Sequence, residues 1–156
     1  MSNKNSKRGL KKDNIDINIY KNFLGNVDIN SILLANLNVS TESNVRPNEI
    51  KVDIKFGAVG KVISENMLDV ACDFTVDAKT NEQEQNDSKN VFKIQFSYNI
   101  TYDVKELSTF SKEYIDFFVL KNVPINIWPY ARELVSSLTT RMGYPPLILE
   151  PYKDFN

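Results

Sequence analysis

Residues 92–102 read FKIQFSYNITY, and this stretch decides the fold of the chain. Its even positions are all aromatic or aliphatic, whereas its odd positions are lysine, glutamine, serine, asparagine and threonine. An apolar period of two predicts a β-strand with one buried and one solvated face. Because one face is solvated, we expect an antiparallel sheet whose apolar face is covered by other elements.

Three further segments complete the predicted sheet. Residues 49–56 (EIKVDIKF) and 68–76 (LDVACDFTV) show the same alternation. Residues 29–39 (INSILLANLNV) are apolar on both parities, which suits a strand with both faces partly covered or a short helix. The polar stretch KTNEQEQNDSKN, residues 79–90, is long for a hairpin loop, and we interpret it as a mobile excursion.

A helix is expected over residues 111–121. One stripe is formed at i, i+4 and i+8 by Phe110, Tyr114 and Phe118. The remaining faces of this helix carry Ile115, Phe117, Val119 and Leu120. A helix that is apolar nearly all round must be covered on more than one side. The sheet covers one side, so we expect a second subunit, another polypeptide, or both, to cover the other.

A second helix follows an apolar connector. Residues 123–127 (VPINI) form the connector, interrupted by Pro124, and Pro129 suits the first turn of the helix. The apolar stripe comprises Trp128, Ala131, Leu134, Val135, Leu138 and Met142. Gly143 marks the end of this helix, and prolines then make residues 144–151 an extended segment. Strands that precede helices along the chain indicate an α+β fold.

The bulk properties predict one domain in the cytoplasm. We assign residues 15–156 to this domain and residues 1–14 to a flexible basic tail. A net charge of −1 provides no field that would hold nucleic acid or an anionic membrane. No apolar run approaches the ~20 residues that span a bilayer, and the N-terminus lacks the apolar core of a secretion signal.

No motif with recognisable chemistry emerges from the sequence. The chain has no histidine and one cysteine, Cys72, which falls in an apolar series and is expected to be a buried, inert thiol. Residues 57–61 (GAVGK) lack the spacing of a phosphate-binding loop, and we interpret them as a turn between strands. Asp69, Asp73 and Asp77 form an acidic row that could suggest a cation site. Residues four apart on a strand lie roughly 13 Å from each other, which is too far to bind one cation, so we interpret the row as a solvated face. We therefore expect no catalytic residue, no metal and no cofactor.

The C-terminal part carries a distinctive run of residues. Pro124 is followed by IWPYARE at residues 127–133, and then by Pro145, Leu147, Leu149, Pro151 and Phe155. Together with the order and spacing of the strands, this run resembles the SecB-like chaperone family over about residues 45–155. That family typically has phenylalanine at the position of Trp128. The resemblance assigns a structural role to Pro124, Trp128, Pro129, Tyr130, Ala131, Arg132, Glu133, Pro145 and Pro151.

The resemblance implies both a fold and an activity. It implies a four-stranded antiparallel sheet with helices packed on one face, assembled into a tetramer as a dimer of dimers. It also implies ATP-independent holding of unfolded or partly folded polypeptide clients in apolar grooves. The implied groove residues are Tyr114, Phe117, Phe118, Leu120, Val123, Ile125, Tyr144, Leu147 and Leu149. The implied residues of the subunit interface are Phe92, Ile94, Phe96 and Tyr98.

The partner stays open at this point. Export chaperones of this family continue into a further helix and a tail that docks the SecA motor, whereas this chain stops at Asn156, which puts SecA docking in doubt. The client is then an exported protein or a dedicated one, such as the antitoxin of a toxin–antitoxin–chaperone module. The alternative is an adaptor or structural subunit of a larger assembly with the same fold. A small-molecule-binding or enzymatic domain is disfavoured, because no set of polar residues converges.

Overall fold

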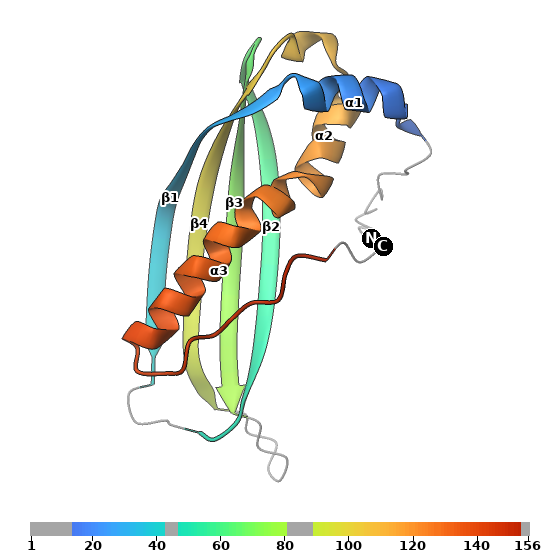
Figure 1. The fold of residues 1–156 in the computed structure, drawn as a ribbon. Coiled ribbons are helices and arrows are strands. Elements are labelled where there is room, and N and C mark those ends of the chain that lie inside the picture. Colours follow the sequence, from blue (N-terminus) through green and yellow to red (C-terminus); the bar gives the residue numbers. More distant parts are fainter. Residues whose placement is uncertain (1–13, 43–46, 81–88, 154–156) are drawn as a thin grey trace, which may run out of the picture.

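One antiparallel sheet organises the chain. The computed structural model describes residues 14–42, 47–80 and 89–153. The strands are β1 (Val27–Thr41), β2 (Ile50–Ser64), β3 (Met67–Thr80) and β4 (Asn90–Val104), in the order β1-β4-β3-β2. Every neighbouring pair is antiparallel, which confirms the predicted four-stranded sheet and the α+β class. β1 and β2 are the two edge strands (Figure 1).

The observed strands are longer than the alternation predicted. β2 continues through residues 57–61, so the expected turn in GAVGK is wrong, and the turn to β3 lies at residues 65–66. The pairing of β2 with β3 runs without a register shift over residues 50–62. Residues 29–39 form a strand rather than a helix. They belong to an edge strand that is largely exposed, which corrects the expectation that both faces are partly covered.

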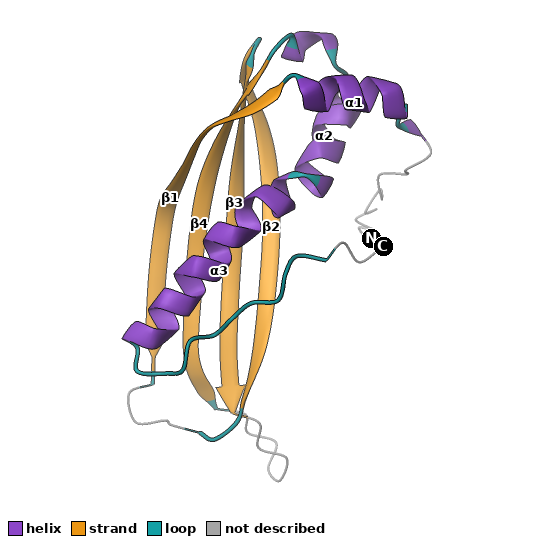
Figure 2. Ribbon diagram, in the orientation of Figure 1, coloured by secondary structure: helices purple, strands orange, loops and turns teal. Residues whose placement is uncertain are grey.

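Helices and an extended C-terminal segment cover one face of the sheet and leave the other face open (Figures 1 and 2). The helices are α1 (Ile17–Gly25), the 3-10 helix η2 (Leu107–Thr109), α2 (Lys112–Lys121) and α3 (Val123–Arg141). α3 crosses the sheet diagonally, whereas α1 and α2 lie together at one end of it. Residues 144–153 contain neither helix nor strand and return over the sheet beside α3 (Figure 1); we call this segment the strap.

The sequence patterns did not predict α1. Asp16 caps its N-terminus, because the Asp16 carboxylate accepts hydrogen bonds from the backbone N–H groups of Asn18 at 2.8 Å and Ile19 at 3.3 Å. The ring of Tyr20 packs edge-on against Phe117 of α2, with 4.9 Å between the ring centroids. The second side of α2, for which we expected another polypeptide, is therefore covered in part by α1 of the same chain, while Leu120 stays 49% exposed.

α3 begins earlier than predicted. Residues 123–127, expected to be a connector, form the start of α3, and Pro124 rather than Pro129 lies in its first turn. Pro124 is tolerated there because the N–H groups of the first turn have no partner inside a helix. Pro129 lies within the helix, where its missing N–H removes one backbone hydrogen bond. As a result, only Asn122 separates α2 from α3.

The core lies between the helices and the inner faces of β3 and β4. Every second side chain is buried over residues 68–78 of β3 and residues 92–104 of β4, which confirms the predicted buried faces of these strands. Cys72 belongs to this core and is 0% exposed, as expected. Ile127, Ala131 and Val135 cover the sheet from α3 and are also 0% exposed.

Some predictions concern residues outside the described ranges. These are residues 1–13 of the basic tail, residues 81–88 of the polar loop, and Phe155. Within the described ranges, no helix combines the length and the apolar character that crossing a membrane requires.

Candidate functional site

A pocket of about 480 Å³ opens beside the free edge of β2. It is lined by residues 56–60 of β2, by Lys112, Asp116, Val119 and Leu120 of α2, by Pro124 of α3 and by Tyr152 of the strap. Among the described strands, β2 pairs with β3 alone, so half of its backbone hydrogen-bonding groups point away from the sheet. The site therefore places a mainly apolar hollow next to an unpaired strand edge.

Small residues of β2 shape this hollow. A Cβ atom added at Gly60 would lie 2.8 Å from Cγ2 of Val119, so the glycine allows α2 to approach β2 closely. A Cβ atom added at Gly57 would meet nothing within 4 Å. Gly60 is thus required by the packing of α2, whereas Gly57 lies in open space at the edge of the pocket.

Aromatic rings connect the pocket to the core. We call the rings of Phe96, Phe74, Phe56, Trp128 and Tyr152 the aromatic ladder. Ring centroids are 4.7 Å apart for Phe74 and Phe96, and 4.8 Å apart for Phe56 and Phe74. Trp128 lies 6.1 Å from Phe56 and 5.4 Å from Tyr152. Phe56 and Tyr152, the two aromatic residues of the pocket lining, therefore both contact Trp128.

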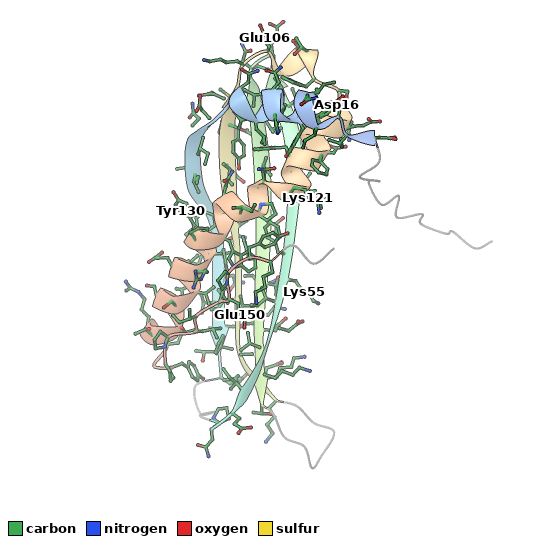
Figure 3. The ribbon with its side chains drawn as sticks, turned by 45° about the vertical axis from the view of Figure 1, so that its right-hand side comes forward. Asp16, Lys55, Glu106, Lys121, Tyr130 and Glu150 are labelled. Atoms are coloured by element: carbon green, nitrogen blue, oxygen red, sulfur yellow. The ribbon has the colours of Figure 1, made fainter. Side chains whose placement is uncertain are left out.

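Two side chains of α3 attach the strap. Near the start of the strap, the backbone N–H of Leu147 donates to Oγ1 of Thr139 at 2.9 Å, and Thr139 is 0% exposed. Near its end, Nε1 of Trp128 donates to the carbonyl oxygen of Glu150 at 2.6 Å. Figure 3 shows Glu150 on the strap and Tyr130 on the opposite side of α3. The second attachment lies two residues from Tyr152 of the pocket lining, whereas the first lies three residues earlier and outside the lining.

One ion pair lies at the rim of the pocket. Nζ of Lys112 is 2.6 Å from Oδ2 of Asp116, one helical turn further along α2. The Lys112 side chain is 84% exposed, and exposed pairs of this spacing contribute only about 0.3–0.5 kcal/mol. The pair therefore makes the rim of the pocket polar and adds little to the stability of the fold.

The perturbed titratable groups lie outside the pocket. Burial, aided by the neighbouring Asp73 carboxylate, raises the pKa of the Cys72 thiol to about 12. Burial also raises the pKa of Tyr20 to about 12. It raises the pKa of Tyr102 to about 12 against the opposing effect of a hydrogen bond from Asn126. A thiol with such a pKa stays protonated near neutral pH, so Cys72 is a packing residue and not a nucleophile.

The structure divides the predicted groove residues into three groups. The side chains of Tyr114, Phe118, Val123 and Leu149 are buried inside the protomer. Those of Phe117, Tyr144 and Leu147 are partly buried against the core. Those of Leu120 and Ile125 are 49% and 59% exposed, and Leu120 is the one predicted residue that lines the described pocket. The four buried residues thus pack in the core of the protomer, and a client groove stays a prediction for all nine.

Sequence reasoning missed most of the pocket lining. A signal was present in residues 57–60, where two glycines and an alanine interrupt an apolar series. Glycine inside a strand often marks the close approach of another element. We instead interpreted these glycines as a turn. Tyr152 carried no comparable signal, because its position depends on the path of the strap.

The predicted interface residues are also core residues of the protomer. Their exposed fractions are 3% for Phe92, 0% for Ile94, 3% for Phe96 and 7% for Tyr98. β4 lies between β1 and β3, so both of its edges are already paired within the chain. In the single protomer the apolar face and both backbone edges of this stretch are therefore occupied, and its role in an interface stays a prediction.

β1 presents the exposed apolar edge instead. Leu33 is 63% exposed on the open face, and Leu34 and Leu37 are 44% and 40% exposed on the face that carries the helices. β1 contains no lysine, arginine or proline, whereas β2 carries Lys51, Lys55 and Lys61. Charged residues and prolines are the usual protection of an edge strand against pairing with another chain. Apart from Asp28 near its start, β1 lacks this protection.

The residues of the distinctive C-terminal run occupy different environments. Ala131 is fully buried, and Tyr130 is 46% exposed with its ring 6.1 Å from that of Tyr98. Arg132 is partly buried, and its Nε has no hydrogen-bond partner among the described residues. Glu133, Pro145 and Pro151 are exposed. With Trp128 in the aromatic ladder and Pro124 in the first turn of α3, these positions support a structural role for much of the run.

One solved structure shares this fold. It is a complex of the SecB-like chaperone Rv1957 of Mycobacterium tuberculosis with a ChAD peptide from the HigA1 antitoxin Rv1956. The two chains superpose with a TM-score of 0.71 and 17% sequence identity, covering 86% of this chain and 97% of that chain. The observed sheet with helices on one face is therefore the SecB-like fold.

Sequence comparisons point to the same family. The family model described as preprotein translocase subunit SecB matches residues 11–156. The protein-export protein SecB of Bartonella quintana is 26% identical over 116 residues, which cover 73% of this chain and 68% of that relative. The protein-export protein SecB of Neorickettsia sennetsu is 26% identical over 124 residues, which cover 78% of this chain and 74% of that relative. The chain therefore belongs to the SecB family of chaperones.

Proposed function

We propose that this chain is an ATP-independent holdase that acts in the cytoplasm and binds unfolded or partly folded polypeptides. The observation that carries this proposal is the apolar pocket beside the unpaired edge of β2. Membership of the SecB family supports the chaperone activity. The bound peptide of the structural neighbour supports a polypeptide as the ligand.

An extended client segment fits the geometry of this site. Its backbone pairs with the free edge of β2, and one large apolar side chain enters the pocket. Burying such a side chain provides roughly 1.5–3 kcal/mol, which is too little to hold a chain alone against the cost of association. Several subunits that engage one flexible client turn the later contacts into intramolecular ones, so weak sites together hold it firmly.

Two classes of client follow from the comparisons. The protein-export relatives support exported precursors as clients, and the structural neighbour supports a dedicated antitoxin. Fluorescence anisotropy with labelled, unfolded segments of each class separates the two. A dedicated chaperone binds the antitoxin segment tightly and the precursor segments weakly, whereas an export chaperone binds both to similar extents.

We also propose that the chain assembles through β1, as a dimer that pairs into a tetramer. The regular stretch Asn36–Thr41 offers an edge without charge, and Leu34 and Leu37 leave apolar surface beside it. Antiparallel pairing of one strand with its own copy gives a two-fold symmetric interface, the commonest arrangement in homodimers. Such pairing also covers the strand edge that β1 leaves unprotected.

Light scattering from a refolding client tests the holdase function. The purified protein, at stoichiometric amounts, suppresses aggregation when a denatured client is diluted into buffer. Leu120→Glu places a charge in the pocket lining at a residue that is 49% exposed, and it abolishes much of the suppression without unfolding the chain. Ile125→Glu, at a residue that is 59% exposed and outside the lining, is the matched control and retains activity.

Unchanged aggregation with the wild-type protein would refute the holdase proposal. If the protein then co-purifies with one folded partner at fixed stoichiometry, the adaptor function replaces it. Equal loss of suppression in the variants at Leu120 and Ile125 would place the client elsewhere on the helical face.

A further inference from the structure

We infer that Trp128 is a positioning residue of the client pocket: it fixes Tyr152 as the outer wall and so determines which client side chains the pocket prefers. This inference rests on the proposed holdase function. Trp128 does not itself line the pocket. It acts through the strap, by one hydrogen bond and one ring contact.

The hydrogen bond is specific to an indole. Nε1 of Trp128 donates to the carbonyl oxygen of Glu150 at 2.6 Å, two residues before Tyr152. The Trp128 ring also contacts Tyr152, with 5.4 Å between the ring centroids. A phenylalanine at position 128 keeps an aromatic ring but has no donor for Glu150.

Pro151 separates Glu150 from Tyr152 and has no N–H, so it cannot donate a backbone hydrogen bond. Trp128 contacts the strap on both sides of this proline, through the carbonyl oxygen of Glu150 and the ring of Tyr152. On its other side, Trp128 contacts Phe56 and Phe74, which belong to the paired strands β2 and β3. Trp128 thus packs against the sheet and the strap at the same time, and so fixes the strap relative to the sheet.

The consequence for client choice follows from the position of the wall. Phe56 and Tyr152 supply the aromatic surfaces of the pocket; the paired strand β2 holds Phe56, and Trp128 contacts both rings. A flat aromatic side chain of a client makes ring contacts with a wall held in place, worth roughly a two- to tenfold gain in affinity over an aliphatic side chain. If Tyr152 is no longer held in place, we expect the preference for an aromatic side chain to be lost while the client still binds.

Fluorescence anisotropy with two labelled peptides tests the inference. The peptides are extended and identical except for a central phenylalanine in one and a central leucine in the other. We expect the wild-type protein to prefer the phenylalanine peptide. We expect Trp128→Phe to bind that peptide roughly three- to tenfold more weakly, the effect of one lost hydrogen bond, and to lose much of the preference.

Thr139→Val is the matched control. It removes the other hydrogen bond between an α3 side chain and the strap, the one donated by the backbone N–H of Leu147, three residues before Glu150 and outside the pocket lining. We expect this variant to keep the preference for the phenylalanine peptide. A spectroscopic readout is also available, because Trp128 is the one tryptophan of the chain. Its indole N–H proton exchanges slowly with solvent in the wild-type protein, and its NMR signal shifts when the phenylalanine peptide binds.

The outcomes separate the inference from the proposed function. If the wild-type protein binds neither peptide, both fail. If it prefers the phenylalanine peptide and Trp128→Phe retains the full preference, the inference fails and the holdase function stands. Equal loss of preference in Thr139→Val also overturns it, because the strap then acts as a whole. Should Trp128→Phe not fold, Tyr152→Ala removes the wall directly and must abolish the preference; if that variant keeps it, the inference is wrong.

Discussion

Replacing Gly60 by alanine tests the packing that forms the pocket. The added Cβ would lie 2.8 Å from Cγ2 of Val119, whereas carbon atoms pack best at about 3.5–4.0 Å. Either α2 or β2 must therefore shift by roughly 1 Å, and overpacking of this kind costs about 1–3 kcal/mol. The alanine recovers about 0.4–1 kcal/mol by restricting the unfolded chain. We expect a net destabilisation of about 1–2 kcal/mol for Gly60→Ala.

Urea unfolding followed by the fluorescence of Trp128 measures this loss, at one fixed protein concentration because the proposed assembly would add to the stability. Gly57→Ala is the matched control on the same strand, since its new Cβ meets nothing within 4 Å, and we expect a change within about 0.5 kcal/mol. Val119→Ala removes the atom that clashes. In the double variant of Gly60 and Val119, we therefore expect a loss smaller than the sum of the single losses by about 1 kcal/mol or more. If Gly60→Ala is neutral and shows no coupling to Val119, α2 does not rest on β2 at this point, and the pocket described here is not formed.

Three further predictions concern assembly and ionisation. Leu37→Lys, at a residue of β1 that is 40% exposed, is expected to shift the native mass towards the monomer. Ile54→Lys, at a residue of β2 that is 36% exposed, is expected to leave the mass unchanged. Equal effects of the two variants on native mass spectra would contradict pairing through β1. Cys72 is expected to resist a thiol reagent in the folded protein and to react once per chain in denaturant, because burial raises its pKa to about 12; rapid labelling without denaturant would show that the core opens. The contribution of Cys72, Tyr20 and Tyr102 to the free energy of unfolding is expected to fall as the pH rises from about 9.0 towards about 12, because burial raises their pKa values and they therefore ionise earlier in the unfolded chain than in the folded one; a urea midpoint that does not fall at alkaline pH would contradict this.

The strands were predictable because alternation in a half-buried strand reports burial directly. In β4, each even residue from Phe92 to Tyr102 packs inward and each odd residue faces solvent or is only partly covered. In β1 the same reasoning was ambiguous, since an edge strand is exposed on both faces and places apolar residues on either parity. Leu33 and Leu34 are adjacent, point to opposite faces and are both exposed.

The site was less predictable because it depends on which elements cover which residues. Apolar periodicity identifies Phe118 and Leu120 as apolar residues of one helix, but it does not indicate that α1 covers the first and leaves the second exposed. Phe118 contacts Phe23 of α1, with 5.4 Å between the ring centroids, and is 2% exposed. α1 itself was missed, although Asp16 followed by Tyr20 and Phe23 carries a cap and an apolar spacing that predict a short helix.

The two edges of the sheet differ in a way that assigns them different partners. Both edges expose backbone groups that can pair with another strand, so a chaperone of this fold risks aggregating with itself. β2 carries Lys51, Lys55 and Lys61 against one acid, Asp53, and this net positive charge opposes the approach of an identical strand. It does not oppose a neutral or acidic segment of another protein. On β1, the stretch Asn36–Thr41 has no charge to oppose its own copy. The proposed self-association through β1 and the proposed client binding along β2 are therefore compatible, because they use opposite edges of the sheet and the net charge of β2 disfavours its pairing with its own copy.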